Sequence, residues 1–292
     1  KQAEGWKRST LDMFRSSICR FCLFLDAKGI GNYKEITAPL VKQFNVEDHH
    51  ATPEGKNAYN SRIRMFLGHL GENGGLSNPF LFLALNNVAA PKETLVVTLT
   101  GAEQKELEGM LRSGDGQISL RKKAMLQLGL HMGIRGIDIV NLIIDSIDWE
   151  NASIRFMQAK TSYEVNLPMP DDVANALYRY IMQERPDSTG QNVFLRKNAP
   201  FSPLEANACC NALHAALPDR NVPGSGFHVL RKTFGTNLLK TGSDPQEVAE
   251  ALGHQGMATV HRYMSLDEDR MRSCCLSLAG HGLLLEGGFY HG

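Results

Sequence analysis

Four side chains that could act on a phosphate ester lie close together near the C-terminal end of the sequence. The stretch HVLRKTFGTNLLKTGSDPQEVAEALGHQGMATVHRYMSL contains His228, Arg231, His254 and Tyr263. His228 and Arg231 are three residues apart, so on a helix both can face one side. An arginine is always charged and can bind two phosphate oxygens at once. A tyrosine, with a pKa of about 10, is a slow nucleophile unless cations stabilise its developing charge. If Tyr263 attacks phosphorus, the site also needs a second cation and an acid for the leaving oxygen.

Two segments upstream supply further charged residues at suggestive spacings. GIRGID places Arg135 two residues after Gly133 and Asp138 three residues later, and QAKTSYEVNLP places Lys160 eight residues before Pro168. Together with HVLR, LGH and TVHRY, these segments resemble the tyrosine recombinases, the phage integrases and their relatives. That family's pattern is an arginine in G-x-R-x-x-E/D, a lysine in a β-hairpin, then H-x-x-R, L-G-H and a tyrosine. Each motif is weak alone, and the resemblance rests on all six positions occurring in order and at the expected spacings. It covers nearly the whole chain, because the N-terminal bundle also resembles the family's core-binding domain.

The resemblance implies how the phosphate would be held and attacked. Arg135 and Arg231 would clamp the non-bridging oxygens of the scissile phosphate and stabilise the transition state. Tyr263 would attack the phosphorus and form a 3′-phosphotyrosyl bond. The bond energy would stay in this covalent link, so the reaction would need no ATP, and with two guanidiniums it would need no metal ion or other cofactor.

The resemblance also implies roles for the groups that move or hold protons. Lys160 would protonate the departing 5′-oxygen, and His228 would assist proton transfer on the tyrosine side. His254 would hydrogen-bond the phosphate, and Asp138 would orient Arg135. One departure follows the H-x-x-R motif, where the family often has histidine or arginine and this chain has Lys232.

Each of these residues has an ordinary structural explanation when it is taken alone. Arg135 at a helix start would be a surface or capping residue, and Lys160 in a turn would be solvated. His254 would satisfy a backbone carbonyl, and Tyr263 on an amphipathic helix would pack in the core. The functional interpretation is favoured because the ordinary ones together require several coincidences of order and spacing.

Bulk composition sets the broad class of the protein. A chain of 292 residues with 42% hydrophobic residues is long enough for two domains, each with its own core. No apolar run could span a bilayer. Equal numbers of basic and acidic residues, 31 of each, argue mildly against a nucleic-acid partner but leave room for local basic patches. The start, KQAEGWKRST, lacks a methionine and an apolar signal core, so we expect an excised segment.

The six cysteines predict no disulfide framework. Cys209 and Cys210 are adjacent, as are Cys274 and Cys275. The C-x-x-C spacing of Cys19 and Cys22 has no second pair at a zinc-site distance and lies within a helical apolar pattern, which favours core packing over metal binding. A reducing, cytoplasmic location associated with the nucleoid is expected.

The apolar periodicity predicts a helical N-terminal bundle and a mixed second part. Helices are expected over 9–28, 37–44 and 52–74, followed by a short one near Asn78. The segment NNVAAPKETLVVTLT, with a proline among small residues, predicts a linker. The predicted organisation is a core-binding, DNA-binding domain at 1–87, a linker at 88–97, a catalytic domain at 98–280 and a tail at 281–292.

The second part should be mainly helical with a small antiparallel sheet. Strands are expected near Ile147, at 154–157 and at 163–167, because β-branched residues there alternate between turn-forming segments. Helices are expected at 100–111, 119–131, 171–185 and 202–217, and then through the motif-bearing stretch. The predicted fold is therefore the two-domain, mainly α architecture of the tyrosine recombinases.

The resemblance predicts a strand transferase that acts on double-stranded DNA at specific sites. Recombination breaks two duplexes, so it implies a homotetramer on two sites. The apolar tail GLLLEGGF would dock on a neighbouring protomer, as is common in the family, or pack within its own chain. The expected role is movement of a transposon or other integrative element, with chromosome-dimer resolution as an alternative. Two rivals remain open: a type IB topoisomerase, and a DNA-binding protein that has lost catalysis.

Overall fold

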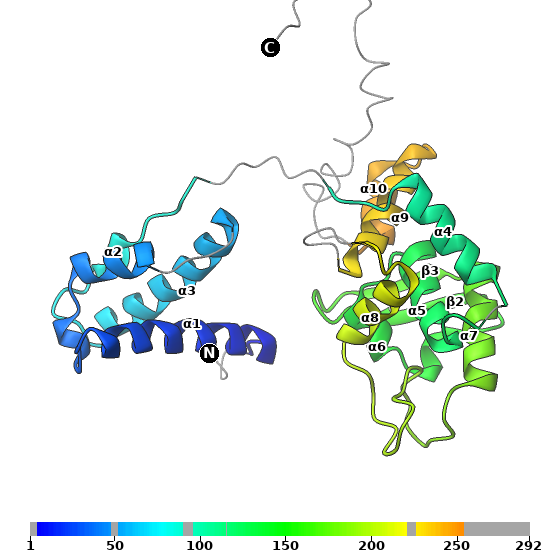
Figure 1. Ribbon diagram of the computed structural model, residues 1–292, viewed down its shortest axis with the longest axis horizontal. Coiled ribbons are helices and arrows are strands. Elements are labelled where there is room, and N and C mark those ends of the chain that lie inside the picture. The colour runs from blue at the N-terminus through cyan, green and yellow to red at the C-terminus, as the bar shows by residue number, and fades with distance from the viewer. Residues whose placement is uncertain (1–4, 48–51, 90–95, 115, 221–225, 254–292) are drawn as a thin grey trace, which may run out of the picture. The chain divides into compact units, whose positions relative to one another are not determined.

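The chain divides into two compact units, Lys1–Thr94 and Leu95–Gly292, whose elements are labelled in Figure 1. The computed structural model describes residues 5–47, 52–89, 96–114, 116–220 and 226–253. The division between the units falls inside the predicted linker, while the roles assigned to the two parts remain predictions. Within the described residues, no helix has both the length and the apolarity to cross a membrane.

The first unit is a small helical bundle. Its helices are α1 (Arg8–Ala27), α2 (Ala38–Glu47) and α3 (Pro53–Glu72), with 3₁₀ turns at Tyr33–Glu35 and Leu81–Ala84. Helix α1 packs against α3, and the second 3₁₀ turn packs against both α2 and α3. The core is rich in aromatic rings, and Phe21 and Phe44 meet edge to face with ring centroids 4.9 Å apart. This bundle has its own core, so it can fold around apolar contacts of its own.

Two details of α1 correct the sequence-based expectations. The helix begins at Arg8, directly after Lys7, which is one residue earlier than the predicted start at residue 9. Cys19 is exposed and Cys22 is half-buried, so the prediction of core packing is wrong for Cys19. The buried positions of α1 are Ser17, Phe21 and Leu25, and Cys19 lies on a different side of the helix.

The second unit combines seven helices and a small sheet among its described residues. They are α4 (Gly101–Arg112), α5 (Leu120–His131), α6 (Gly136–Asn141), β1 (Ile147–Asp148), β2 (Ser153–Met157), β3 (Glu164–Pro168), α7 (Asp171–Gln183), α8 (Asn207–Ala216), α9 (His228–Lys240) and α10 (Pro245–Ala251), with a 3₁₀ turn at Ile144–Ser146. The strands form an antiparallel sheet in the order β1-β2-β3, with Ile154 opposite Leu167. The predicted fold class, mainly helical with a small antiparallel sheet, is confirmed.

Helix α5 forms the centre of the second unit. Every residue from Ala124 to Leu130 is buried, which a helix can reach only when other elements surround it. Helices α7, α8 and α9 all pack against α5, and Figure 1 shows them around it. The Ser119 hydroxyl accepts a hydrogen bond from the Lys122 N–H and so caps its N-terminus. A rigid central helix fixes the position of whatever follows its C-terminus.

Candidate active site

Arg135 stands at the turn that follows the C-terminus of α5. Gly133 makes this turn with φ +63°, and a Cβ there would lie 2.6 Å from the Phe234 ring, so only glycine fits. Arg135 then occupies the N-cap position of α6, and its side chain is 13% exposed. The guanidinium is thus attached to the most rigid part of the unit and still reaches solvent.

Asp138 connects Arg135 to the β2–β3 hairpin. It lies in the first turn of α6 and is 2% exposed. Its Oδ2 is 3.9 Å from Arg135 Nη1, and its Oδ1 accepts a 2.7 Å hydrogen bond from the Ala159 N–H. One buried carboxylate therefore contacts both a predicted phosphate-binding arginine and the residue before Lys160.

Lys160 lies in the tight turn between β2 and β3. The Gln158 N–H donates to the Tyr163 carbonyl and the Ser162 N–H donates to the Gln158 carbonyl, each at 2.9 Å, which closes the loop. Ser162 adopts φ +55°, a left-handed conformation that the turn requires. Lys160 is exposed, as expected for a residue at a hairpin tip.

Arg231 is as deeply buried as Asp138. It lies one turn into α9 and is 2% exposed. Its Nη1 donates to the Gly133 carbonyl at 2.7 Å, and its Nη2 donates to the Leu252 carbonyl. These bonds join α9 to the ends of α5 and α10, so the guanidinium is held in one orientation.

His228 is the first residue of α9, one turn before Arg231. Solvent reaches one side of the residue, but burial of its ring lowers the pKa to about 4, with further lowering from Arg231, Lys232, Arg135 and Lys160. The imidazole is therefore neutral at pH 7 and has a nitrogen able to accept a proton.

The same electrostatic effect shows which predicted residues the fold brings together. Arg135, Lys160 and Arg231 come from three different elements, yet each is close enough to act on the pKa of His228. Lys232, the position that departs from the family pattern, adds a further cation to this group. His254 and Tyr263 lie outside the described residues, as does the tail at 281–292.

The structure adds partners that the sequence analysis missed. The carbonyl oxygens of Gly133 and Leu252 bind Arg231, and the buried Gln158 side chain donates to the same Leu252 carbonyl. Backbone oxygens leave no trace in residue type, so only the glycine in GIRG and the LGH motif gave any hint of these positions. Gln158 carries no such signal, because in sequence it belongs to a polar, turn-like segment.

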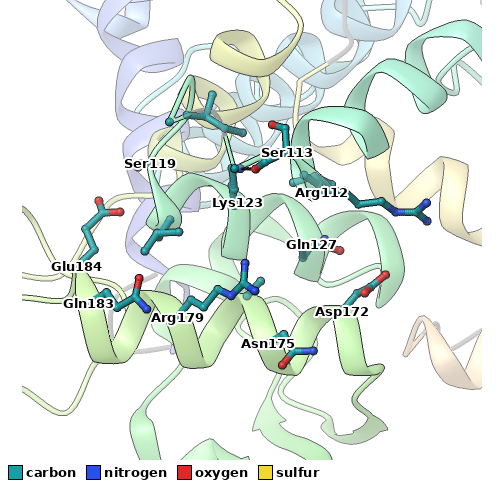
Figure 2. Close-up of a pocket in the computed structure, with 16 residues that line it drawn as sticks. Arg112, Ser113, Ser119, Lys123, Gln127, Asp172, Asn175, Arg179, Gln183 and Glu184 are labelled. Atoms are coloured by element: carbon teal, nitrogen blue, oxygen red, sulfur yellow. Dashed lines mark hydrogen bonds between the residues drawn. The ribbon is translucent and has the colours of Figure 1, made fainter.

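A groove in the second unit is lined by residues other than these cations. It has a volume of about 730 Å³ and runs between α5, α7 and the end of α4. Figure 2 shows Lys123 and Gln127 from α5 on one side, with Asp172, Arg179 and Glu184 on the other. Lys123 lies in the first turn of α5, whereas Arg135 follows the C-terminus of that helix. A DNA backbone is a long exposed polymer, so its binding site is expected on an open surface, and the groove contains no predicted catalytic residue.

Comparison with known proteins decides the family. The profile described as "Phage integrase family" matches residues 98–270. The chain belongs to the phage integrase family. That match contains all six positions quoted from the sequence and covers more than half of the chain.

Named relatives agree with this assignment. The "Putative integrase/recombinase y4gC" of Sinorhizobium fredii is 30% identical over 164 residues, which are 55% of this chain and 84% of the relative. "Tyrosine recombinase XerD" of Mycobacterium tuberculosis is 26% identical over 276 residues, 89% of this chain and 88% of the relative. The second alignment shows that the likeness extends through the N-terminal unit as well.

Solved structures share the fold. The XerH site-specific recombinase, bound to palindromic difH substrate in a post-cleavage complex, superposes with a TM-score of 0.74 at 16% identity, over 91% of this chain and 78% of that chain. A lambda integrase fragment, solved as a dimer bound to a COC′ core site, superposes with a TM-score of 0.66 at 16% identity and 89% coverage of both chains. Family and fold together establish this phage integrase family member as a tyrosine recombinase, an enzyme that transfers DNA strands in site-specific recombination.

Proposed function

We propose that this recombinase cuts and rejoins duplex DNA through a 3′-phosphotyrosyl intermediate on Tyr263, and that it moves an integrative element or transposon. The observation that carries the proposal is the way the fold links the three cations: Asp138 contacts Arg135 and the residue before Lys160, and Arg231, one turn after His228, binds the carbonyl of Gly133, two residues before Arg135. Three cations on separate elements form a surface suited to one phosphate, and the imidazole beside them can accept a proton.

The proposed first step breaks one bond and forms one. The Tyr263 oxygen attacks phosphorus while its proton passes to His228. The bond from phosphorus to the 5′-oxygen breaks, and Lys160 donates a proton to that oxygen. Arg135 and Arg231 stabilise the negative charge that grows on the non-bridging oxygens, with His254 hydrogen-bonding the same phosphate.

The second step is the reverse reaction with a different strand. A 5′-hydroxyl from the partner duplex attacks the phosphotyrosyl bond, Lys160 takes up its proton, and His228 returns a proton to Tyr263. Because the phosphodiester energy is kept in the covalent bond, this sequence uses no ATP. The two proposed steps also use no metal ion and no cofactor.

The proposed partners are DNA and further copies of the chain. Paired breaks on two duplexes require a homotetramer, in which the tail at 281–292 docks on a neighbouring protomer. The similar structures support a DNA partner, since XerH was solved with difH and lambda integrase with a core site. The N-terminal unit at 1–87 would then bind the same duplex, so that the two units together close around the DNA.

One assay separates this proposal from a topoisomerase and from an inactive DNA-binding protein. Supercoiled plasmids with and without the DNA that flanks the gene are incubated with the protein and examined for recombinants, relaxation and a denaturant-stable protein–DNA adduct. Recombinants and adduct only with the flanking DNA support the proposal. Relaxation of both plasmids without recombinants would indicate a topoisomerase, and binding without adduct would indicate lost catalysis.

A further inference from the structure

We propose that Gln158 is a positioning residue that ties the β2–β3 hairpin to the end of α10 and thereby places Lys160 at the scissile phosphate. This inference rests on the proposed role of Lys160 as the acid for the leaving oxygen. It assigns a task to a side chain that lies two residues before the lysine and does not touch the substrate.

The Gln158 side chain is buried and bonded through both ends of its amide. It is 2% exposed, and its Nε2 donates to the Leu252 carbonyl at 3.3 Å. Its Oε1 accepts a 2.8 Å hydrogen bond from the Thr161 hydroxyl, on the other side of Lys160 in the same turn. A buried polar group with both ends paired is rigid, because breaking either bond leaves an unsatisfied atom away from water.

Gly253 fits closely against this amide. It has φ +59°, and a Cβ built there would collide with the Gln158 side chain, with the Cδ only 2.8 Å away. The backbone after α10 therefore approaches the glutamine as closely as any residue allows. The hairpin and the chain that leads toward His254 are thus packed against each other at this point.

The Leu252 carbonyl makes the contact relevant to catalysis. It accepts one hydrogen bond from Gln158 and another from Arg231 Nη2. The hairpin that bears the proposed acid and the helix that bears a proposed phosphate ligand therefore share one acceptor. Through it, the position of Lys160 is fixed relative to Arg231.

Lys160 needs this support because of where it lies. It is exposed at a hairpin tip, outside the paired strands, and a lysine side chain has many rotamers. Among the contacts that join the turn to the rest of the unit, Asp138 binds the Ala159 N–H, and Gln158 binds Leu252. Removing the second would leave the strands paired but allow the tip to move away from the phosphate.

The test is Gln158→Met, which roughly keeps length and volume but removes both the amide donor to Leu252 and the amide acceptor from Thr161. Cleavage of ordinary DNA should slow by about tenfold, the effect expected of one buried hydrogen bond. On DNA with a sulfur in place of the bridging 5′-oxygen, which leaves without a proton, the rate should return to within about twofold of the parent enzyme. Thr161→Val should show the same pattern with a smaller loss, and the hairpin amides should exchange hydrogen faster in both variants.

Two further variants distinguish the possible outcomes. Asn166→Ala, at an exposed position of β3, controls for general damage to the hairpin and should match the parent enzyme. Lys160→Ala, measured beside it, tests the role of the acid. If Lys160→Ala is rescued by the sulfur and Gln158→Met is not, the positioning inference is wrong and the proposed function stands. If Lys160→Ala is not rescued, the acid assignment fails and the inference with it.

Discussion

Arg231 and Lys160 carry the same charge, but the molecule holds them in opposite ways. Arg231 lies within α9, is 2% exposed, and binds carbonyls at the ends of two other helices. Lys160 lies in a turn between two five-residue strands and is exposed. Arg231 is held by the packed helices around it, whereas the hairpin tip is held by contacts that include Asp138 with the Ala159 N–H and Gln158 with Leu252.

This difference fits the two tasks proposed for them. A group that stabilises charge on the non-bridging oxygens acts best when it is already oriented before the substrate arrives. A group that gives up a proton and takes it back must follow the leaving oxygen and tolerate some movement. We therefore expect substitutions on the helical side to harm every substrate, and substitutions on the hairpin to harm only those substrates that need a proton.

Loss of an arginine should have the largest effect. Arg231→Ala and Arg135→Ala should each slow cleavage by about a hundredfold or more, the scale of one charged transition-state contact. The 5′-sulfur substrate should not restore either rate, because neither arginine protonates the leaving group. Single-turnover cleavage measures this, with circular dichroism to confirm the fold of Arg231→Ala. Parent rates in either variant would show that these arginines do not bind the phosphate.

Lys160→Ala should slow cleavage of ordinary DNA by about a hundredfold, the lower end of the range for general acid catalysis. On the 5′-sulfur substrate most of this loss should disappear. The ratio of the two rates is the measurement. An equal loss on both substrates would make Lys160 a DNA-binding residue and would remove the contrast between the two regions.

Asp138 touches both regions, so its substitution shows which contact matters. Asp138→Asn keeps an oxygen for the Ala159 N–H but removes the charge beside Arg135. If the carboxylate acts through Arg135, cleavage should slow by about tenfold on both substrates, as expected for one charged pair. Recovery on the sulfur substrate would instead place its effect on the hairpin.

The smallest expected effect concerns the pH dependence of the cleavage rate. The pKa of His228 is lowered from an ordinary 6.5 to about 4, so the ring stays neutral well below pH 6.5. For the free enzyme, reported by kcat/KM, the rate at about pH 5 should remain within about twofold of that at pH 7, and should fall as the pH approaches 4. A decline centred near 6.5 would contradict this, and His228→Gln should lose the low-pH limb.

The lowered pKa of His228 also makes the free energy of unfolding depend on pH. Between an ordinary pKa of 6.5 and the lowered value of about 4, the unfolded chain binds a proton at this position that the folded chain does not. The contribution of His228 to the free energy of unfolding is thus fully present above pH 6.5 and is lost as the pH falls toward 4. Denaturant unfolding of the parent and His228→Gln at pH 7 and pH 5 measures the difference.

The sequence predicted those parts of the fold that depend on local pattern. Alternating residues around Ile154 and the turn at Lys160 located the sheet, and α5 begins at Leu120, one residue after the expected start at Ser119. The helix expected from Ser202 begins only at Asn207, because Pro203 pairs with Leu195 in a bridge. The spacing of apolar residues contains no information about a backbone pairing of this kind. The predicted helix start at Ser202 was therefore wrong because of a tertiary contact.

The candidate site shows the same limit. Residue types and spacing were enough to name Arg135, Lys160, His228 and Arg231, all of which the fold brings into one group. The bond from Gln158 to Leu252 spans 94 residues of sequence, and that from Arg231 to Gly133 spans 98. Contacts over such distances depend on how α5, α9 and α10 pack, and no local pattern contains that information.

The identity of the residue that becomes linked to DNA tests the central claim most directly. A nicked substrate that carries the flanking DNA traps the covalent complex, which is digested and examined by mass spectrometry. We predict a single modified peptide with the 3′-phosphate on Tyr263, and no adduct from Tyr263→Phe although that variant still binds DNA. An adduct on another residue, or one that survives in Tyr263→Phe, would contradict the account.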